Sequence, residues 1–181
     1  PSLEESSAKL LIGTSNLDKH CKCLQVRRGS YSRTWQEVLI AASDGTFARD
    51  FRLHQSIGLN VLASDSDNLS SIGRRFGSYG NPNHLRNWNT EDCAKDISQS
   101  VGKMLYADYV EAGQMPVVLA NKFGGVIFHE ACGHLLETTQ LERGTSPFSN
   151  KLGQQIANKA VTAIDEGISN QSFGTITIDD E

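Results

Sequence analysis

The sequence predicts an α+β fold, in which an antiparallel sheet with packed helices is followed by the start of a second α+β domain. Short apolar runs separated by turn-forming residues occupy residues 21–77, and apolar residues at helical spacing follow Thr90. The pattern changes again after residue 113. We therefore expect residues 1–112 to form a central α+β domain and residues 113–181 to form the incomplete N-terminal part of another.

The first half should begin with a helix over residues 3–12 that ends at Gly13, where glycine easily forms a left-handed cap. An antiparallel meander should follow, in which Cys21 and Cys23 alternate along the first strand and point to opposite faces. A further strand is expected at 35–41. Turn-forming residues end the strands at Asp44-Gly45 and at Asp65-Ser66-Asp67-Asn68.

The second half should begin with a loop over residues 77–89, which are rich in Gly, Asn and Pro. Thr90 then has the hydroxyl of a helix cap, and the helix should end near Gly113. Another helix starts at Val126. The remaining expected elements are a buried strand at 117–119, a helix at 149–159 and strands at about 160–165 and 174–179.

The composition excludes several classes of protein. A net charge of −4 and a pI near 5.7 argue against capture of nucleic acid or an anionic membrane as the main role. No apolar run is long enough to span a bilayer, and no secretory signal is visible. The four cysteines form no zinc-finger pairs and no disulfide framework, so we expect reduced thiols in a cytoplasmic protein.

The most informative segment is His129-Glu130-Ala131-Cys132-Gly133-His134. Neutral imidazoles suit zinc, so His129 and His134 are candidate metal ligands. A glutamate beside the first ligand can take a proton from the attacking water and pass it to a leaving amine, which makes Glu130 the candidate catalytic residue. This division of roles suits amide hydrolysis at neutral pH.

The spacing of the two histidines requires an irregular helix. Residues at i and i+5 of a regular helix are rotated apart by roughly 140°. A π-helical turn would bring both rings to one side, and Gly133 is the expected point of distortion because it lacks a Cβ. The sequence therefore predicts a π-bulge between His129 and His134.

Two histidines do not complete a zinc site, because at least one more protein ligand is expected. Glu137 can be that ligand, a partner of a ligand or a surface acid, and we favour one of the last two. Cys132 should point away from His129 as a small buried filler. The other histidines, His20, His54 and His84, are expected in the core or on the surface.

The residues around the motif resemble the TldD/PmbA family of metallopeptidases, which includes proteins called modulators of DNA gyrase. The resemblance is carried by residues 113–119, 124–134, 143–146 and 178–181, and upstream by 42–45 and the region of Arg52. It is closest to the TldD branch, because PmbA (TldE) subunits generally lack the histidine motif. Leu135 departs from the family, which usually has glycine after the second histidine.

The resemblance implies a zinc-dependent peptidase that acts on peptides or unfolded proteins, with His129 and His134 as zinc ligands and Glu130 as acid and base. It implies a cysteine ligand from later in the chain, beyond Glu181. The partner would be a PmbA/TldE-like subunit or a second copy. Alternatives are a non-catalytic scaffold or regulatory subunit of the same family and, less favoured by the acidic pI, a module that binds nucleic acid or gyrase.

Overall fold

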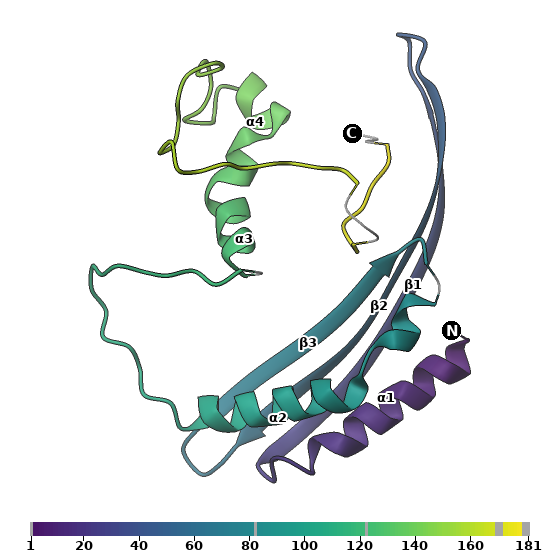
Figure 1. Ribbon diagram of the computed structural model, residues 1–181, viewed down its shortest axis with the longest axis vertical. Helices are drawn as coiled ribbons and strands as arrows, with labels where there is room; N and C mark the ends of the chain where they lie inside the picture. Colours follow the sequence, from purple (N-terminus) through teal and green to yellow (C-terminus); the bar gives the residue numbers. More distant parts are fainter. Residues whose placement is uncertain (1, 82, 122, 169–171, 179–181) are drawn as a thin grey trace. The chain divides into compact units, whose positions relative to one another are not determined.

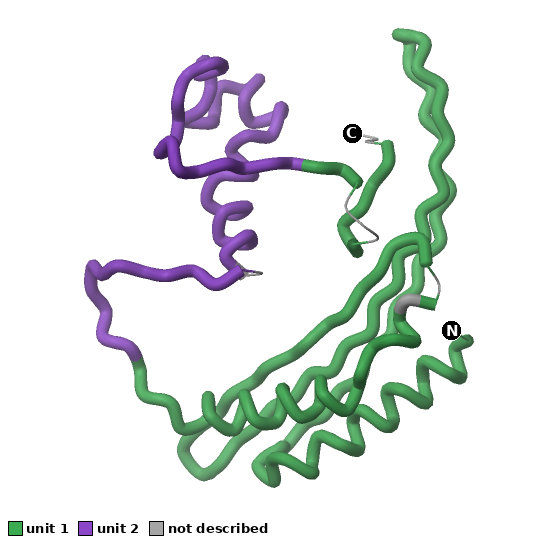
Figure 2. The backbone as a smooth tube through the Cα atoms, in the orientation of Figure 1, with its two compact units in different colours: residues 1–109, 166–181 green, residues 110–165 purple. Residues whose placement is uncertain are grey.

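The computed structural model describes residues 2–81, 83–121, 123–168 and 172–178 (Figure 1). The chain divides into two units, which are shown in different colours in Figure 2. One unit comprises Pro1–Tyr109 and Glu166–Glu181, and the other comprises Val110–Asp165. The first unit contains an antiparallel sheet with packed helices, which confirms the predicted α+β class.

Three strands form the sheet in the order β1-β2-β3. They span Leu24–Ala41 (β1), Phe47–Ser64 (β2) and Leu69–Tyr79 (β3), and both neighbouring pairs are antiparallel. Only residues 54–64 of β2 pair with β3, so the β1–β2 hairpin continues beyond β3, as Figure 1 shows. The predicted meander is therefore present, with strands longer than expected.

The two hairpin turns form where the sequence predicts them. Gly45 has a φ of +96°, a conformation that L side chains rarely adopt. In the second turn the carboxylate of Asp65 accepts the backbone N–H groups of Asp67 and Asn68, at 3.0 and 2.9 Å. These local contacts set the strand registers at each end of β2.

Two helices, α1 (Leu3–Leu17) and α2 (Thr90–Leu105), pack against each other and against the sheet (Figure 1). Alternate residues of β2 face them, because the side-chain period of a strand is two. A short 3-10 helix, η1 (His84–Asn87), precedes α2. The buried core cluster consists of Leu17, Leu24, Leu59, Val61, Ala63, Ala94, Ile97, Val101 and Leu105.

The predicted end of α1 at Gly13 is wrong, because the helix continues to Leu17. Gly13 is buried within it, and a Cβ at this position would lie 3.0 Å from Leu59 Cδ1. The glycine therefore allows close packing of helix on sheet and does not cap the helix. Ser2 and Glu5 form a reciprocal capping box at the other end.

Both predicted ends of α2 also need correction. Thr90 is the first helical residue and the cap is Asn89, whose side chain accepts the backbone N–H groups of Glu91 and Asp92. The helix ends at Leu105, well before Gly113. Tyr109 and Val110 follow the helical spacing, but they are exposed, so continuing the helix to them would bury no apolar surface.

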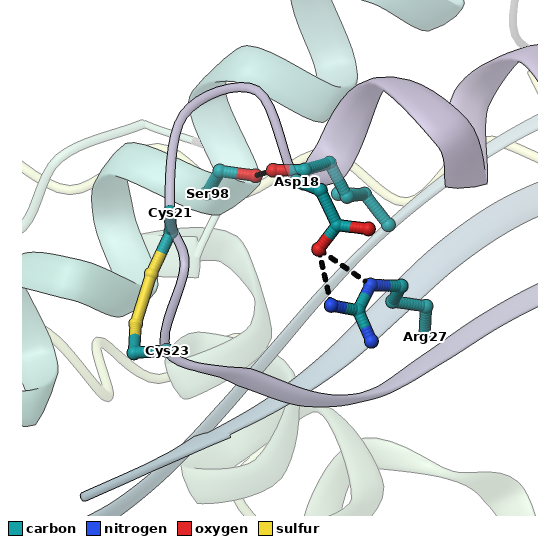
Figure 3. Close-up of a disulfide and its surroundings, with 6 residues drawn as sticks. Asp18, Cys21, Cys23, Arg27 and Ser98 are labelled. Carbon is teal, nitrogen blue, oxygen red and sulfur yellow. Dashed lines mark hydrogen bonds and ion pairs between the residues drawn. A yellow bond between two sulfur atoms is a disulfide. The ribbon is translucent and has the colours of Figure 1, made fainter.

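Cys21 and Cys23 form a disulfide, which corrects the expectation of reduced thiols on opposite faces of a strand (Figure 3). Their Cα atoms are 5.5 Å apart. Both residues lie in the turn before β1, so the alternation of a strand does not apply to them. Figure 3 also shows the ion pair between Asp18 and Arg27, which joins the end of α1 to β1. Cys93 and Cys132 are free.

The second unit contains a series of short helical segments, which is interrupted at Glu137, where the backbone is extended. They are α3 (Phe123–Phe128), a π-helical turn η2 (His129–Gly133), a 3-10 turn η3 (His134–Leu136) and α4 (Thr138–Glu142). No helix among the described residues is long and apolar enough to cross a membrane.

Several elements predicted for the second half are absent from the described residues. The strand at 117–119 does not form, and Val118 is 97% exposed, since an isolated strand without a partner gains no ladder hydrogen bonds. The helix at 149–159 is also wrong, because Asn150 and Gly153 have φ values of 63° and 78°. No strand forms at 160–165 or at 174–178, and residue 179 lies outside the described part.

The closing segment of the first unit contacts β2 and β3. Phe173 packs over Gly77, where a Cβ would lie only 2.7 Å from its Cδ2 atom. The Arg52 guanidinium donates to the carbonyl of Ile178 at 2.5 Å and pairs with Asp50 at 3.0 Å. Asp50 and Arg52 are only 8% and 5% exposed, so these contacts are largely withdrawn from water.

Candidate metal centre

The candidate site is built on an irregular helical turn. The residues His129–Gly133 form a single π-helical turn directly after α3, and the His134 N–H donates to the carbonyl of His129, five residues earlier. The π-bulge predicted from the histidine spacing is therefore present. It adds one residue to a turn and so compensates the rotation that separates i and i+5 positions in a regular helix.

The distortion brings the two imidazole rings together. The ring centroids of His129 and His134 are 4.3 Å apart and the ring planes are inclined by 64°. Both side chains are exposed to solvent, so an ion can reach them. The rings are not splayed onto opposite sides of the helix, which would have excluded a shared metal.

Glu130 lies beside these rings. Its Oε2 atom is 3.8 Å from His134 Nε2, and one donor atom from each of His129, Glu130 and His134 lies within 4.8 Å of the others. Among the residues that the structure describes, no other three His, Cys, Asp or Glu side chains come together in this way. Two imidazoles with a nearby carboxylate form a donor set that suits a divalent transition metal.

Glu137 is hydrogen-bonded to the other side of the His134 ring. Its Oε1 atom lies 2.6 Å from His134 Nδ1. This hydrogen bond is the main cause that raises the pKa of His134 above its ordinary value, and the negative charges of Glu137 and Glu130 add to it. Of the three roles left open for Glu137, the geometry favours that of a partner to a candidate ligand.

Gly133 does not need the backbone freedom of glycine here, because its φ and ψ are −57° and −54°. The expectation that the turn distorts here because glycine lacks a Cβ is therefore not confirmed. A Cβ at this position would be 3.4 Å from His129 Nδ1, which is the near limit of ordinary contact. Alanine would thus fit beside the His129 ring, whereas a larger side chain would crowd it.

Cys132 faces apolar side chains and is not part of the donor cluster. It lines a cavity of about 210 Å³ together with seven apolar residues, but it is half-buried and not fully buried as predicted. These are Phe128, Leu136, Phe148, Ile156, Ala157, Val161 and Ala163. His54 lies on β2 against the rings of Tyr79 and Phe173, in the first unit.

Ser146 stabilises the backbone next to His134, although the sequence offered no reason to assign it a role of its own. Ser146 is 6% exposed, and its hydroxyl donates to the carbonyl of Leu135 at 2.5 Å. The same oxygen accepts the backbone N–H of Phe148 at 3.0 Å. Gly144, with a φ of 67°, lies in the turn between α4 and Ser146. The only indication in the sequence is the stretch 143–146 that carries part of the family resemblance.

Comparison with known protein families gives two matches. Residues 2–105 match the PmbA/TldA metallopeptidase central domain, and residues 112–181 match the PmbA/TldA metallopeptidase C-terminal domain. Together the two matched ranges contain most of the chain, including the π-helical turn with both histidines.

Comparison with individual proteins gives relatives of the same kind. The chain is 35% identical to a protein named Metalloprotease TldD homolog from Haemophilus influenzae, with 84% of this chain and 33% of the relative covered. It is 30% identical to a protein of that name from Buchnera aphidicola, with 84% and 33% covered. Metalloprotease MJ0996 of Methanocaldococcus jannaschii is 26% identical, with 98% and 39% covered. The chain therefore spans about a third of the length of these relatives.

Proposed function

Because the chain belongs to the PmbA/TldD metallopeptidase family, we propose that it carries part of the active site of a zinc-dependent peptidase. The substrates would be peptides or unfolded proteins. The main support is the approach of donor atoms of His129, Glu130 and His134 to within 4.8 Å on one π-helical turn.

In this proposal His129 and His134 hold the zinc ion through neutral imidazole nitrogens. A zinc ion bound there supplies Lewis acidity that polarises the scissile carbonyl and stabilises the negative charge developing on its oxygen. Glu130 takes a proton from the attacking water and delivers it to the departing amine. Its carboxylate lies 3.8 Å from His134 Nε2, so the proposed base is beside a proposed ligand.

A third protein ligand is required, because catalytic zinc sites use three. Cys132 is unsuitable, since it lines the apolar cavity and does not belong to the donor cluster. We assign the third position to the cysteine that the family resemblance implies, outside these 181 residues.

The division into a central domain over residues 1–112 and the first part of a catalytic domain over 113–181 is part of the proposal. It is supported by the separate family matches to residues 2–105 and 112–181. The structural units divide the chain nearby, after Tyr109, although residues 166–181 are grouped with the first unit.

A PmbA/TldE-like subunit or a second copy of the chain is the proposed partner, and the cytoplasmic location remains a prediction. Large apolar side chains are exposed on the part of the β1–β2 hairpin beyond β3, and such exposure supports burial against further protein. They are Trp35, Leu39, Phe47 and Phe51. Light scattering of the full-length protein, alone and mixed with a PmbA-like subunit, would measure the assembly.

The decisive experiment is Glu130→Gln in the full-length protein, with Glu142→Gln as a matched exposed carboxylate on α4. Peptide hydrolysis by Glu130→Gln should fall by about a hundredfold or more, since general acid–base catalysis contributes that much. The zinc content should stay at the wild-type level because the imidazole ligands are intact. Unchanged turnover would overturn the assignment of the base.

Metal analysis of the full-length wild-type protein separates the peptidase from a scaffold or regulatory subunit. A peptidase should contain stoichiometric zinc and lose hydrolysis on treatment with a chelator, with recovery when zinc is returned. A purified protein without stoichiometric zinc, and without hydrolysis after zinc is added, would favour the scaffold.

A further inference from the structure

The two ring nitrogens of His134 face different carboxylates. Nδ1 lies 2.6 Å from Glu137 Oε1, whereas Nε2 lies 3.8 Å from Glu130 Oε2. An ionised carboxylate only accepts hydrogen bonds, so the short contact requires the proton on Nδ1. In the neutral ring the lone pair is then on Nε2, the nitrogen that faces Glu130.

The orientation of Glu137 is not explained by helix capping. Glu137 is the N-cap residue of α4, a position where Ser, Thr, Asp and Asn side chains commonly accept a backbone N–H of the first turn. Its side chain makes no such bond. Its backbone carbonyl accepts the N–H groups of Gln140 and Leu141, and its carboxylate is directed to His134.

The turn that connects the two residues is held by a part-buried hydrogen bond. Leu135 lies between His134 and Glu137, and its carbonyl accepts the hydroxyl of Ser146 at 2.5 Å. Because Ser146 is itself buried and hydrogen-bonded to Phe148, the 3-10 turn His134–Leu136 is connected to a chain segment more than ten residues later. The Glu137 side chain thus starts from a fixed backbone position.

From this geometry we propose that Glu137 is a positioning residue, which holds His134 in the tautomer and orientation that present Nε2 to the metal. The proposal rests on the proposed zinc site, because it assigns Glu137 a role toward one of its ligands. Carboxylates that accept the second N–H of a histidine ligand fix its tautomer and increase its basicity. Glu137 itself would not touch the metal or the substrate.

The test uses three variants of the full-length protein. Glu137→Ala removes the acceptor, and Glu137→Gln keeps an oxygen that can accept the Nδ1–H without the charge. Glu142→Ala removes an exposed carboxylate from α4 and serves as the control. Zinc affinity is measured by competition with a chromophoric chelator, and the absorption bands of the cobalt(II)-substituted proteins report the ligand set. Circular dichroism checks that each variant folds.

Zinc affinity should fall by about tenfold to a hundredfold in Glu137→Ala, which is the usual effect of removing such a partner. Glu137→Gln should recover much of the affinity, and Glu142→Ala should match the wild type. The cobalt bands of Glu137→Gln should keep their wild-type positions, because no ligand has been replaced.

Two results would overturn the assignment. Equal zinc affinity in Glu137→Ala and wild type would remove any role of Glu137 in presenting His134. Shifted cobalt bands with equally weak binding in Glu137→Gln and Glu137→Ala would make Glu137 a direct ligand. Failure of the zinc site as a whole is distinguishable, since the wild-type protein would then bind no stoichiometric zinc.

Discussion

The imidazole rings of His129 and His134 lie 4.3 Å apart between centroids, although five positions separate the residues in the chain. A regular helix would rotate the two side chains apart by roughly 140°. The π-helical turn His129–Gly133 removes this rotation, so that both rings can reach one ion. The site therefore depends on the shape of one turn.

Substitution of Gly133 should affect metal binding according to the size of the new side chain. Gly133→Ala adds a Cβ about 3.4 Å from His129 Nδ1, an ordinary contact, so zinc affinity should change little. Gly133→Leu crowds the His129 ring and should weaken zinc binding by roughly tenfold or more, the scale expected when support of a ligand is lost. Titration of the full-length variants with zinc measures both. Equal affinity in Gly133→Leu would contradict the proposed packing.

The buried pair of Asp50 and Arg52 should make stability sensitive to acid. The hydrogen bond from Thr177, together with Arg52, holds the pKa of Asp50 below its ordinary value of 3.8, against the opposing effect of burial. A lowered pKa in the folded state adds stability above pH 4, and this contribution is lost as the pH falls through the lowered pKa.

The corresponding variant is Asp50→Asn, with the exposed Asp108→Asn as a control. At pH 7 we expect Asp50→Asn to lower the free energy of unfolding by about 1–3 kcal/mol, as for loss of a charged hydrogen bond. The difference from wild type should shrink below pH 4. Urea unfolding at a series of pH values measures it, and a difference that stays constant down to pH 2 would refute the assignment.

Cys93 should react slowly with alkylating agents. Burial on α2 raises the pKa of this thiol to about 11 from an ordinary value of 9.0, and the negative charge of Asp96 adds to the effect. Only the thiolate reacts, so at pH 8 its fraction is about a hundredfold below that of an ordinary thiol. Iodoacetamide labelling followed by peptide mass spectrometry should show a correspondingly slow rate.

One variant separates the contributions of burial and of nearby charge to the raised pKa of the Cys93 thiol. Asp96→Asn removes the nearby negative charge and should increase the labelling rate modestly, while burial continues to restrain the thiol. Labelling in denaturant should proceed at the rate of a small free thiol. Equally fast labelling of folded and denatured protein would show that the helix does not bury this side chain.

The core between α2 and the sheet should respond strongly to truncation. Ile97 is fully buried in the core cluster, whereas Met104, on the same helix, is 46% exposed. Ile97→Ala should lower the free energy of unfolding by about 2–5 kcal/mol, through lost burial and the cavity left behind. Met104→Ala should cost less than about 1 kcal/mol. Urea unfolding measures both, and similar losses would contradict the assignment of the buried face.

The sequence predicted the features that depend on contiguous residues. Asp44-Gly45 and Asp65–Asn68 mark turns through their own backbone preferences, so the antiparallel meander could be predicted. The spacing of His129 and His134 required a π-helical turn, and one is present. The same reasoning failed for the strand at 117–119 and the helix at 149–159, because isolated segments form only where they have a partner or a surface.

By itself, then, the sequence predicted the fold class through local patterns and, through its resemblance to known proteins, the family. It also pointed to His129, Glu130 and His134 as candidates for the proposed metal site, because these residues lie close together in the chain. Only the tertiary structure decided which distant residues hold the turn at the candidate site and the buried Asp50 in place. Ser146 meets Leu135, and Thr177 meets Asp50, through contacts between residues distant in the chain. No periodicity encodes such contacts, because they arise only when folding brings separate segments together and removes their polar groups from water.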